Sequence, residues 1–219
     1  MKGLKRSVFV SVLLILLVGA FVGCDNTKPD PKAKVGDIIT FGGYEWLVLD
    51  IEGGRALVVS KDIVERRVYH TPYGSITWAD CSLRAYLNGE FYNSFNDSDR
   101  GRIVEVTNVN EDNQWYGTNG GDDTQDRIFL LSLAEAVKCF GDSGQLADRP
   151  FGENSINDQY NQNRIATFNG SASWWWLRSP GFDSTLASFV SDVGSLYMSG
   201  IDVNIHFYGG VRPALWLNL

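Results

Sequence analysis

Runs of strand-forming residues broken by paired glycines constrain the fold of this chain most strongly. In the segment 35–68, Gly42-Gly43 and Gly53-Gly54 separate runs that are rich in Val, Ile, Leu, Tyr and Trp. Paired glycines between two β-rich runs are typical of tight hairpin turns. The segment is therefore predicted to be a small antiparallel β meander.

The middle segment, 77–141, is predicted to be helical. Apolar side chains recur there at the spacing of one helix face, at Leu83, Tyr86, Leu87 and Phe91. A polar loop rich in Gly and Asn follows at 108–123. Beyond it, Ser132 is the predicted N-cap of a helix that Gly141 ends.

The C-terminal segment, 173–219, returns to short strand-like runs that are separated by glycines. Runs of strands on both sides of a helical block are typical of the α+β class and not of alternating βαβ units. We therefore expect one α+β domain over 35–219, with an antiparallel meander at its N-terminal end.

Residues 1–23 have the pattern of a secretory signal peptide. Basic residues within 2–6 precede an apolar run from Val8 to Val18, and small residues follow it. The apolar stretch is shorter than the roughly 20 residues that a membrane-spanning helix needs. The small residues before Cys24 resemble the bacterial lipobox, although Phe21 stands where Leu is usual.

The lipobox resemblance implies that the chain is cut before Cys24 and that this cysteine is acylated. Two or more acyl chains make a stable membrane attachment. Residues 24–34 are then the lipidated cysteine and a flexible tether, because this stretch is rich in charge and proline. We expect an extracytoplasmic domain held on a membrane by lipid; a plain signal peptide with an incidental cysteine is the alternative.

The composition favours a folded, acidic domain. The chain is 44% hydrophobic, which supports a sizeable core, and its net charge is −7 with a pI of about 4.8. Nucleic acids and anionic lipids are bound by clustered Lys and Arg, so neither is an expected partner. Cys81 and Cys139 are either a disulfide or two free thiols, and the sequence leaves both open.

Several sequence blocks resemble a widespread bacterial family that is known only as a domain of unknown function. The blocks begin at Phe41 (FGGYEW), Thr77 (TWADCSLR), Tyr86 (YLNGEF), Phe129 (FLLSLAEA), Trp175 (WWLRSPG) and Gly210 (GVRPALW). The blocks occur in order, and the resemblance covers the chain from about Val35 onward.

The last two blocks are also similar to the C-type-lectin-like fold of formylglycine-generating-enzyme relatives. That group includes the variable proteins of diversity-generating retroelements, in which residues just before a Gly-Val-Arg strand bind the ligand. The resemblance implies a C-type-lectin-like core that displays a binding surface. It does not extend to the enzyme, because the chain has no cysteine after Cys139.

The segment 182–208 mixes aromatic residues with short polar ones, which is typical of adaptable binding surfaces. We therefore predict that it binds an unknown protein or glycan ligand. The candidate residues are Phe189, Asp192, Tyr197, Met198, Ile201, Asp202, Asn204, His206, Phe207 and Tyr208. An ordinary twisted hairpin with core residues is the alternative.

Motifs for catalysis are not convincing, so we expect neither an enzyme nor a cofactor. His70 and His206 are the only histidines, and no spaced metal-binding set accompanies them. The Gly-Asp-Ser-Gly stretch that starts at Gly141 fits a helix end better than a protease nucleophile. Two other functions stay open: a glycan-binding module that uses Trp174 or Trp176 as a platform, and a structural envelope protein.

Overall fold

The structure, a computed structural model, describes residues 33–205 and 209–219. The predicted signal peptide, the lipidation site Cys24 and most of the predicted tether lie outside the described residues. The same holds for three of the predicted ligand-binding residues, His206, Phe207 and Tyr208.

One sheet contains five antiparallel strands. In spatial order they are β1 (Ile38–Phe41), β2 (Tyr44–Glu52), β3 (Arg55–Ser60), β15 (Ala214–Asn218) and β5 (Ile103–Val104). The predicted meander is confirmed for β1 to β3. The glycine pairs at its turns have positive φ angles, which L side chains rarely adopt: 59° and 83° at Gly42 and Gly43.

The second sheet contains six strands. In spatial order they are β4 (Glu65–Arg67), β14 (Gly209–Val211), β11 (Trp175–Pro180), β12 (Leu186–Val190), β13 (Leu196–Asp202) and β8 (Ser155–Ile156). Only the β11–β14 pair is parallel among these pairings. The predicted meander ended at residue 68, and this end is wrong: β4 leaves the first sheet because Arg66 pairs with Gly210 of β14.

The helices are short, and they are interrupted by small β ribbons. The helical elements are η1 (Trp78–Asp80), α1 (Ser82–Tyr86), η2 (Leu87–Phe91), α2 (Asp97–Arg100), α3 (Leu133–Phe140) and α4 (Asn161–Arg164). The two-stranded ribbons are β6 (Val106–Asn108) with β7 (Thr124–Asp126), and β9 (Ala166–Phe168) with β10 (Ser171–Ser173). The prediction that 77–141 is mainly helical, with a polar loop at 108–123, is therefore confirmed for its helices, but the two ends of the loop pair as a β ribbon that was not predicted.

The predicted start of α3 is confirmed. The Ser132 side chain accepts a hydrogen bond from the backbone N–H of Glu135, and the Glu135 carboxylate accepts one from the N–H of Ser132. Gly141, at a φ of 127°, follows the helix, and a Cβ there would overlap the Tyr160 ring. Both ends of the helix therefore lie where the sequence placed them.

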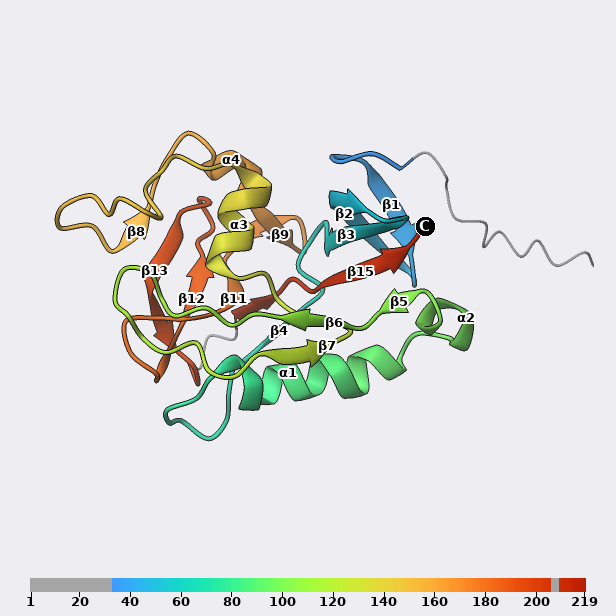
Figure 1. Cartoon of the computed structure of the whole chain (residues 1–219), viewed down its shortest axis with the longest axis horizontal. Coiled ribbons are helices and arrows are strands. Elements are labelled where there is room, and N and C mark those ends of the chain that lie inside the picture. Colours follow the sequence, from blue (N-terminus) through green and yellow to red (C-terminus); the bar gives the residue numbers. More distant parts are fainter. Residues whose placement is uncertain (1–32, 206–208) are drawn as a thin grey trace, which may run out of the picture.

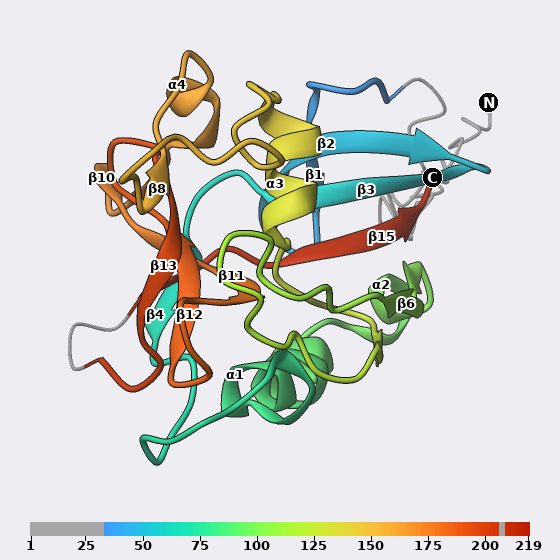
Figure 2. The ribbon, with the colours of Figure 1, turned by 60° about the vertical axis from the view of Figure 1, so that its left-hand side comes forward.

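The two sheets lie side by side, with α3 between them on one side (Figure 2). The helical stretch from α1 to α2 runs along the opposite side (Figure 1). The largest fully buried side chains include Trp46, Trp78, Trp175 and Trp176, which come from both sheets and from η1. This mixture of helices with antiparallel sheets confirms the α+β class. Within the described residues, no helix combines the length and apolarity needed to cross a membrane.

Arg212 ties the two sheets together where the chain crosses between them. Its Nε donates to the carbonyl of Ser60 at 2.8 Å, and its Nη2 donates to the carbonyl of Lys61 at 3.2 Å. The guanidinium also stacks on the Trp175 ring, 4.8 Å from its centre. Burial lowers the pKa of Arg212 to about 10, which leaves it charged at neutral pH. Arg212 therefore forms buried, charge-assisted hydrogen bonds that join the β14–β15 connection to the end of β3.

Candidate functional site

Four aromatic side chains form a continuous row across β11, β12 and β13. We call Trp176, Trp174, Phe189 and Tyr197 the aromatic row. Trp174 meets Trp176 edge-on with ring centres 4.8 Å apart, and it meets Phe189 at 5.4 Å. Phe189 stacks on Tyr197 at 4.7 Å with only 10° between the ring planes. The row exists because the strand register places Phe189 opposite both Trp176 and Tyr197.

Strand alternation decides which tryptophan rings reach this face. Trp175 points to the other face, where its Nε1 donates to the carbonyl of Arg164. Trp176 is fully buried, and its Nε1 donates to the carbonyl of Arg67. Trp174 is only partly buried. Trp175 and Trp176 therefore belong to the core, which leaves Trp174 as the one of the two predicted platform residues with an exposed part.

The structure brings together two of the predicted ligand-binding residues, Phe189 and Tyr197. Both are partly exposed on the same face of the sheet. Met198 is corrected to a core residue: it follows Tyr197 in β13, so its side chain lies on the opposite face, and it is fully buried. Ile201 is half-buried and packs against the core.

The remaining described candidates lie apart. Asp192 is exposed in the turn between β12 and β13, whereas Asp202 is exposed at the far end of β13 with the half-buried Asn204 just beyond it. A strand of this length spans about 20 Å. One small ligand therefore cannot contact both ends of the hairpin, and the described candidates do not form a single small-molecule site.

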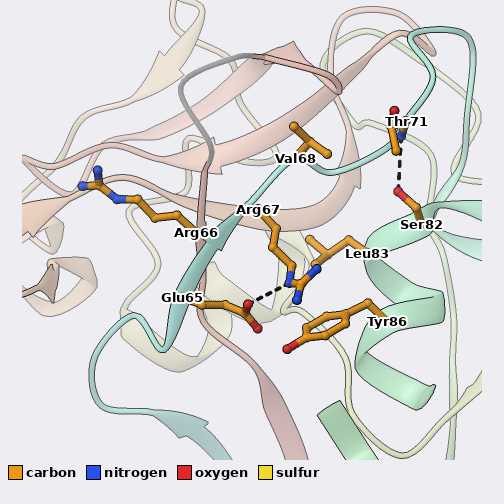
Figure 3. A pocket seen from close by; sticks show the side chains of 8 residues that line it. All are labelled: Glu65, Arg66, Arg67, Val68, Thr71, Ser82, Leu83 and Tyr86. Atoms are coloured by element: carbon orange, nitrogen blue, oxygen red, sulfur yellow. Dashed lines mark hydrogen bonds and ion pairs between the residues drawn. The ribbon is translucent and has the colours of Figure 1, made fainter. Parts of the chain in front are cut away.

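A groove that the sequence did not predict runs between β4 and the α1–η2 helical stretch. One pocket in it has a volume of about 360 Å³ (Figure 3), and a second one of about 270 Å³ adjoins it. Glu65 and Tyr86 line both pockets. The groove could not be predicted, because β4 and α1 are brought together only by long-range pairing; the sole local signal is the pattern Glu-Arg-Arg within a β run.

The groove has a charged and aromatic centre. The Arg67 Nε donates to the Glu65 carboxylate at 2.7 Å, and the guanidinium lies over the Tyr86 ring, 3.4 Å from its centre. Figure 3 shows these three side chains facing one another, with Arg66 pointing away. Burial and the neighbouring Glu65 raise the pKa of Tyr86 to about 12. The Tyr86 hydroxyl therefore stays protonated at neutral pH and can donate a hydrogen bond.

Asp126 is a buried carboxylate that could be mistaken for a catalytic group. Its two oxygens accept hydrogen bonds from the side chains of Trp78, Arg84, Asn88, Asn108 and Thr124. A carboxylate whose oxygens are already occupied has little capacity left for a substrate or a metal ion. Asp126 therefore joins η1, α1 and the β6–β7 ribbon to one another.

The other sequence motifs also have structural partners. Ser143 donates to Asp158 at 2.7 Å, which fits the predicted turn after α3. Arg178 is buried and forms an ion pair with Glu135, so it joins strand β11 to helix α3. Within the described residues, no group of three or more His, Cys, Asp or Glu side chains could hold a metal ion.

The two described cysteines are free thiols. Burial raises the pKa of Cys81 to about 12, and burial with the nearby Glu135 raises that of Cys139 to about 11. Of the two alternatives that the sequence left open, the structure has the free thiols. Neither thiol is activated as a nucleophile, because activation requires a lowered pKa.

Comparisons with known proteins agree with the sequence blocks. A family model described as "Domain of unknown function (DUF6273)" matches residues 53–219. Neither the curated proteins nor the solved structures gave a match. The matched region begins within the first sheet, because β3 starts at Arg55 and β1 and β2 precede it. The chain therefore belongs to the DUF6273 family, and the matched residues include the six-stranded sheet and the strands β3, β5 and β15 of the five-stranded sheet.

Proposed function

We propose that this protein is a membrane-anchored, extracytoplasmic lipoprotein that binds a ligand through the exposed part of the aromatic row. The observation that carries the proposal is the stacked pair of Phe189 and Tyr197, half-exposed beside Trp174. Aromatic rings on a rigid strand offer a large contact area at a small entropic cost. No partner with the chemistry of a nucleic acid is expected, in view of the net charge of −7.

A binding experiment with Tyr197 variants tests this proposal. Purified envelope glycans and surface proteins should be screened with the native protein and with Tyr197→Ser. We expect Tyr197→Ser to weaken capture of any ligand of this face by about tenfold, since stacking on one ring contributes roughly 1–1.5 kcal/mol. Asp202→Asn, at the far end of β13, is the matched control. Equal capture by the native protein and Tyr197→Ser would overturn the proposal.

A glycan is the second candidate ligand, and the partly exposed Trp174 favours it. Sugar rings pack on tryptophan faces, so a bound glycan should quench the fluorescence of Trp174. The variant Trp174→Phe should bind with less quenching. If the ligand is instead a protein, selection with surface proteins will yield it while sugars leave the fluorescence unchanged.

The membrane attachment rests on the sequence before residue 33. Incorporation of labelled palmitate into the native protein, and its loss in Cys24→Ser, would support lipidation. Palmitate that remains in Cys24→Ser would contradict it.

The C-type-lectin-like core and diversification by a retroelement are the finer parts of the proposal. They rest on the similarity of the blocks at Trp175 and Gly210. A near-copy of the 182–219 coding segment that differs mainly at adenines, next to a reverse transcriptase, would support diversification. A locus without such a copy would mean a fixed binding surface.

A further inference from the structure

The second pocket of the groove is lined by aromatic and acidic residues that have no part in the proposed function. Its walls include three aromatic side chains, Tyr44 from β2, Tyr86 from α1 and Phe91 from η2. The other lining residues are Val64, Ser94 and the two acids Glu65 and Glu90. Because these residues come from separate elements that pack together, the pocket is a product of the whole fold.

The partly exposed rings of Tyr44 and Tyr86 reach the surface of the pocket, and the buried Phe91 ring packs against both of them. The centre of the Phe91 ring is 5.7 Å from that of Tyr44 and 6.1 Å from that of Tyr86, each at an interplanar angle of 46°. Tilted rings present different faces and edges to a shared space. The faces of aromatic rings carry negative charge density and attract cations.

The protein itself shows that one of these rings accepts a cation. In the adjoining pocket, the Arg67 guanidinium lies 3.4 Å from the centre of the Tyr86 ring and is paired with Glu65. The same two residues, Tyr86 and Glu65, also line the second pocket. Arg67 lines only the first pocket, so the lining of the second adds Tyr44 and Glu90, which Arg67 does not contact, to the two residues that it does.

The charge of the second pocket is therefore unbalanced. Glu65 is paired with Arg67, but Glu90 is exposed and has no ion pair within the described residues. The pocket volume of about 270 Å³ lies below the range of roughly 300–1,000 Å³ for drug-sized ligands. A small positively charged group fits both the charge and the size.

We propose that this pocket binds an organic ammonium group, held by the rings of Tyr44 and Tyr86, with the buried Phe91 behind them, and by the carboxylates of Glu65 and Glu90. The site is separate from the aromatic row and does not depend on the proposed function. A quaternary ammonium would use mainly the rings, whereas a primary ammonium would also donate hydrogen bonds to the carboxylates.

Calorimetric titration of the purified protein with choline, with ethanolamine and with 3,3-dimethylbutanol tests the proposal. The last compound has the shape of choline without its charge. We expect saturable binding of choline or ethanolamine and markedly weaker binding of the neutral alcohol. The preferred amine distinguishes a quaternary from a primary ammonium ligand. No saturable binding of either amine, or equal binding of choline and the alcohol, would overturn the proposal.

Variants then locate the binding site. Glu90→Gln should weaken amine binding by about threefold, because it removes one exposed charge, and Tyr86→Leu should weaken it by about tenfold. The control is Glu153→Gln, an exposed acid next to β8 at the opposite edge of the six-stranded sheet. Urea unfolding of each variant shows whether it is folded. If Tyr86→Leu does not fold, Glu90→Gln still tests the proposal. Amine binding that Glu90→Gln and Glu153→Gln alter equally would contradict the assignment.

Discussion

The two sheets differ in how far apart in sequence their neighbouring strands lie. In the five-stranded sheet, β1, β2 and β3 follow one another through glycine turns. In the six-stranded sheet, β4 pairs with β14, so Arg67 lies opposite Gly209, and β14 runs parallel to β11. Both candidate binding regions involve the second sheet. The comparison teaches that the consecutive strands β1 to β3 form through local turns, whereas the groove arises from the long-range pairing of β4 and also uses Tyr44 of β2.

The largest expected effect contrasts a glycine from each sheet. A Cβ at Gly209 would lie 2.2 Å from the Trp176 Nε1, whereas a Cβ at Gly43 meets nothing within 4 Å. Gly209→Ala should therefore cost about 3 kcal/mol of unfolding free energy through overpacking. Gly43→Ala should cost about 1 kcal/mol, because alanine is strained at its positive φ of 83°. Urea unfolding measures both, and similar losses would contradict the contrast.

A buried ion pair and an exposed one provide the second contrast. Arg178 of β11 is buried against Glu135, whereas Lys61 and Glu45, beside the five-stranded sheet, are exposed. Arg178→Met should lower the free energy of unfolding by about 2–3 kcal/mol, because it leaves a half-buried carboxylate without its partner. Lys61→Met should cause no measurable loss. A larger effect from Lys61→Met would break the distinction.

Acid should lower the free energy of unfolding through protonation of Asp158, which lies just after β8 of the six-stranded sheet. Burial raises the pKa of this carboxyl, but hydrogen bonds from Ser143 and Arg164 outweigh burial, and the net pKa lies below its ordinary value of 3.8. The stabilisation is therefore complete above pH 3.8 and is lost as the pH falls through the folded-state pKa. Arg164 also donates to the carbonyl of Gly194 in the β12–β13 turn, so that turn should weaken with it.

Unfolding curves at several pH values check this effect. Asp158→Asn should be less stable than the native protein at neutral pH, and the difference should shrink as the pH falls through the acid range. The control is Asp192→Asn, because Asp192 is exposed in the β12–β13 turn. It should leave the pH profile unchanged. A constant difference between Asp158→Asn and the native protein would exclude Asp158 as the source.

The smallest effect concerns the thiols. With pKa values of about 12 for Cys81 and about 11 for Cys139, both should react slowly with iodoacetamide at pH 8 in the folded protein. The half-buried Cys139 should react before the buried Cys81. Mass spectrometry after timed alkylation measures the order. Rapid labelling of Cys81 would show that the region around α1 opens easily.

Features that depend on near neighbours could be predicted from the sequence. The capping of α3 by Ser132, the glycine turn at Gly42 and the opposite facing of Trp175 and Trp176 each depend on residues a few positions apart. In contrast, Arg67 reaches Tyr86 only because β4 joins a distant strand. Loop closure and strand pairing over such separations leave no periodic signal.

In the candidate site too, contacts between residues near in sequence could be predicted, and contacts between distant elements could not. Phe189 and Tyr197 could be predicted from the mixed aromatic and polar composition of one segment, and the register of its hairpin brings them together. Met198 was misassigned because composition does not reveal which face of the strand is covered. The groove needed Glu65, Tyr86 and Glu90 from separate elements, and these were not identified.

The placement of β14 and β15 has a consequence for how the chain matures. β14 lies between β4 and β11, and β15 lies between β3 and β5, so residues 209–218 fill the middle of both sheets. Synthesis and translocation deliver the N-terminal part first. The hairpins of β1 to β3 can form early, but the edges of β3 and β4 stay open until this segment emerges. Until it emerges, the unpaired N–H and C=O groups at those edges can pair with other chains.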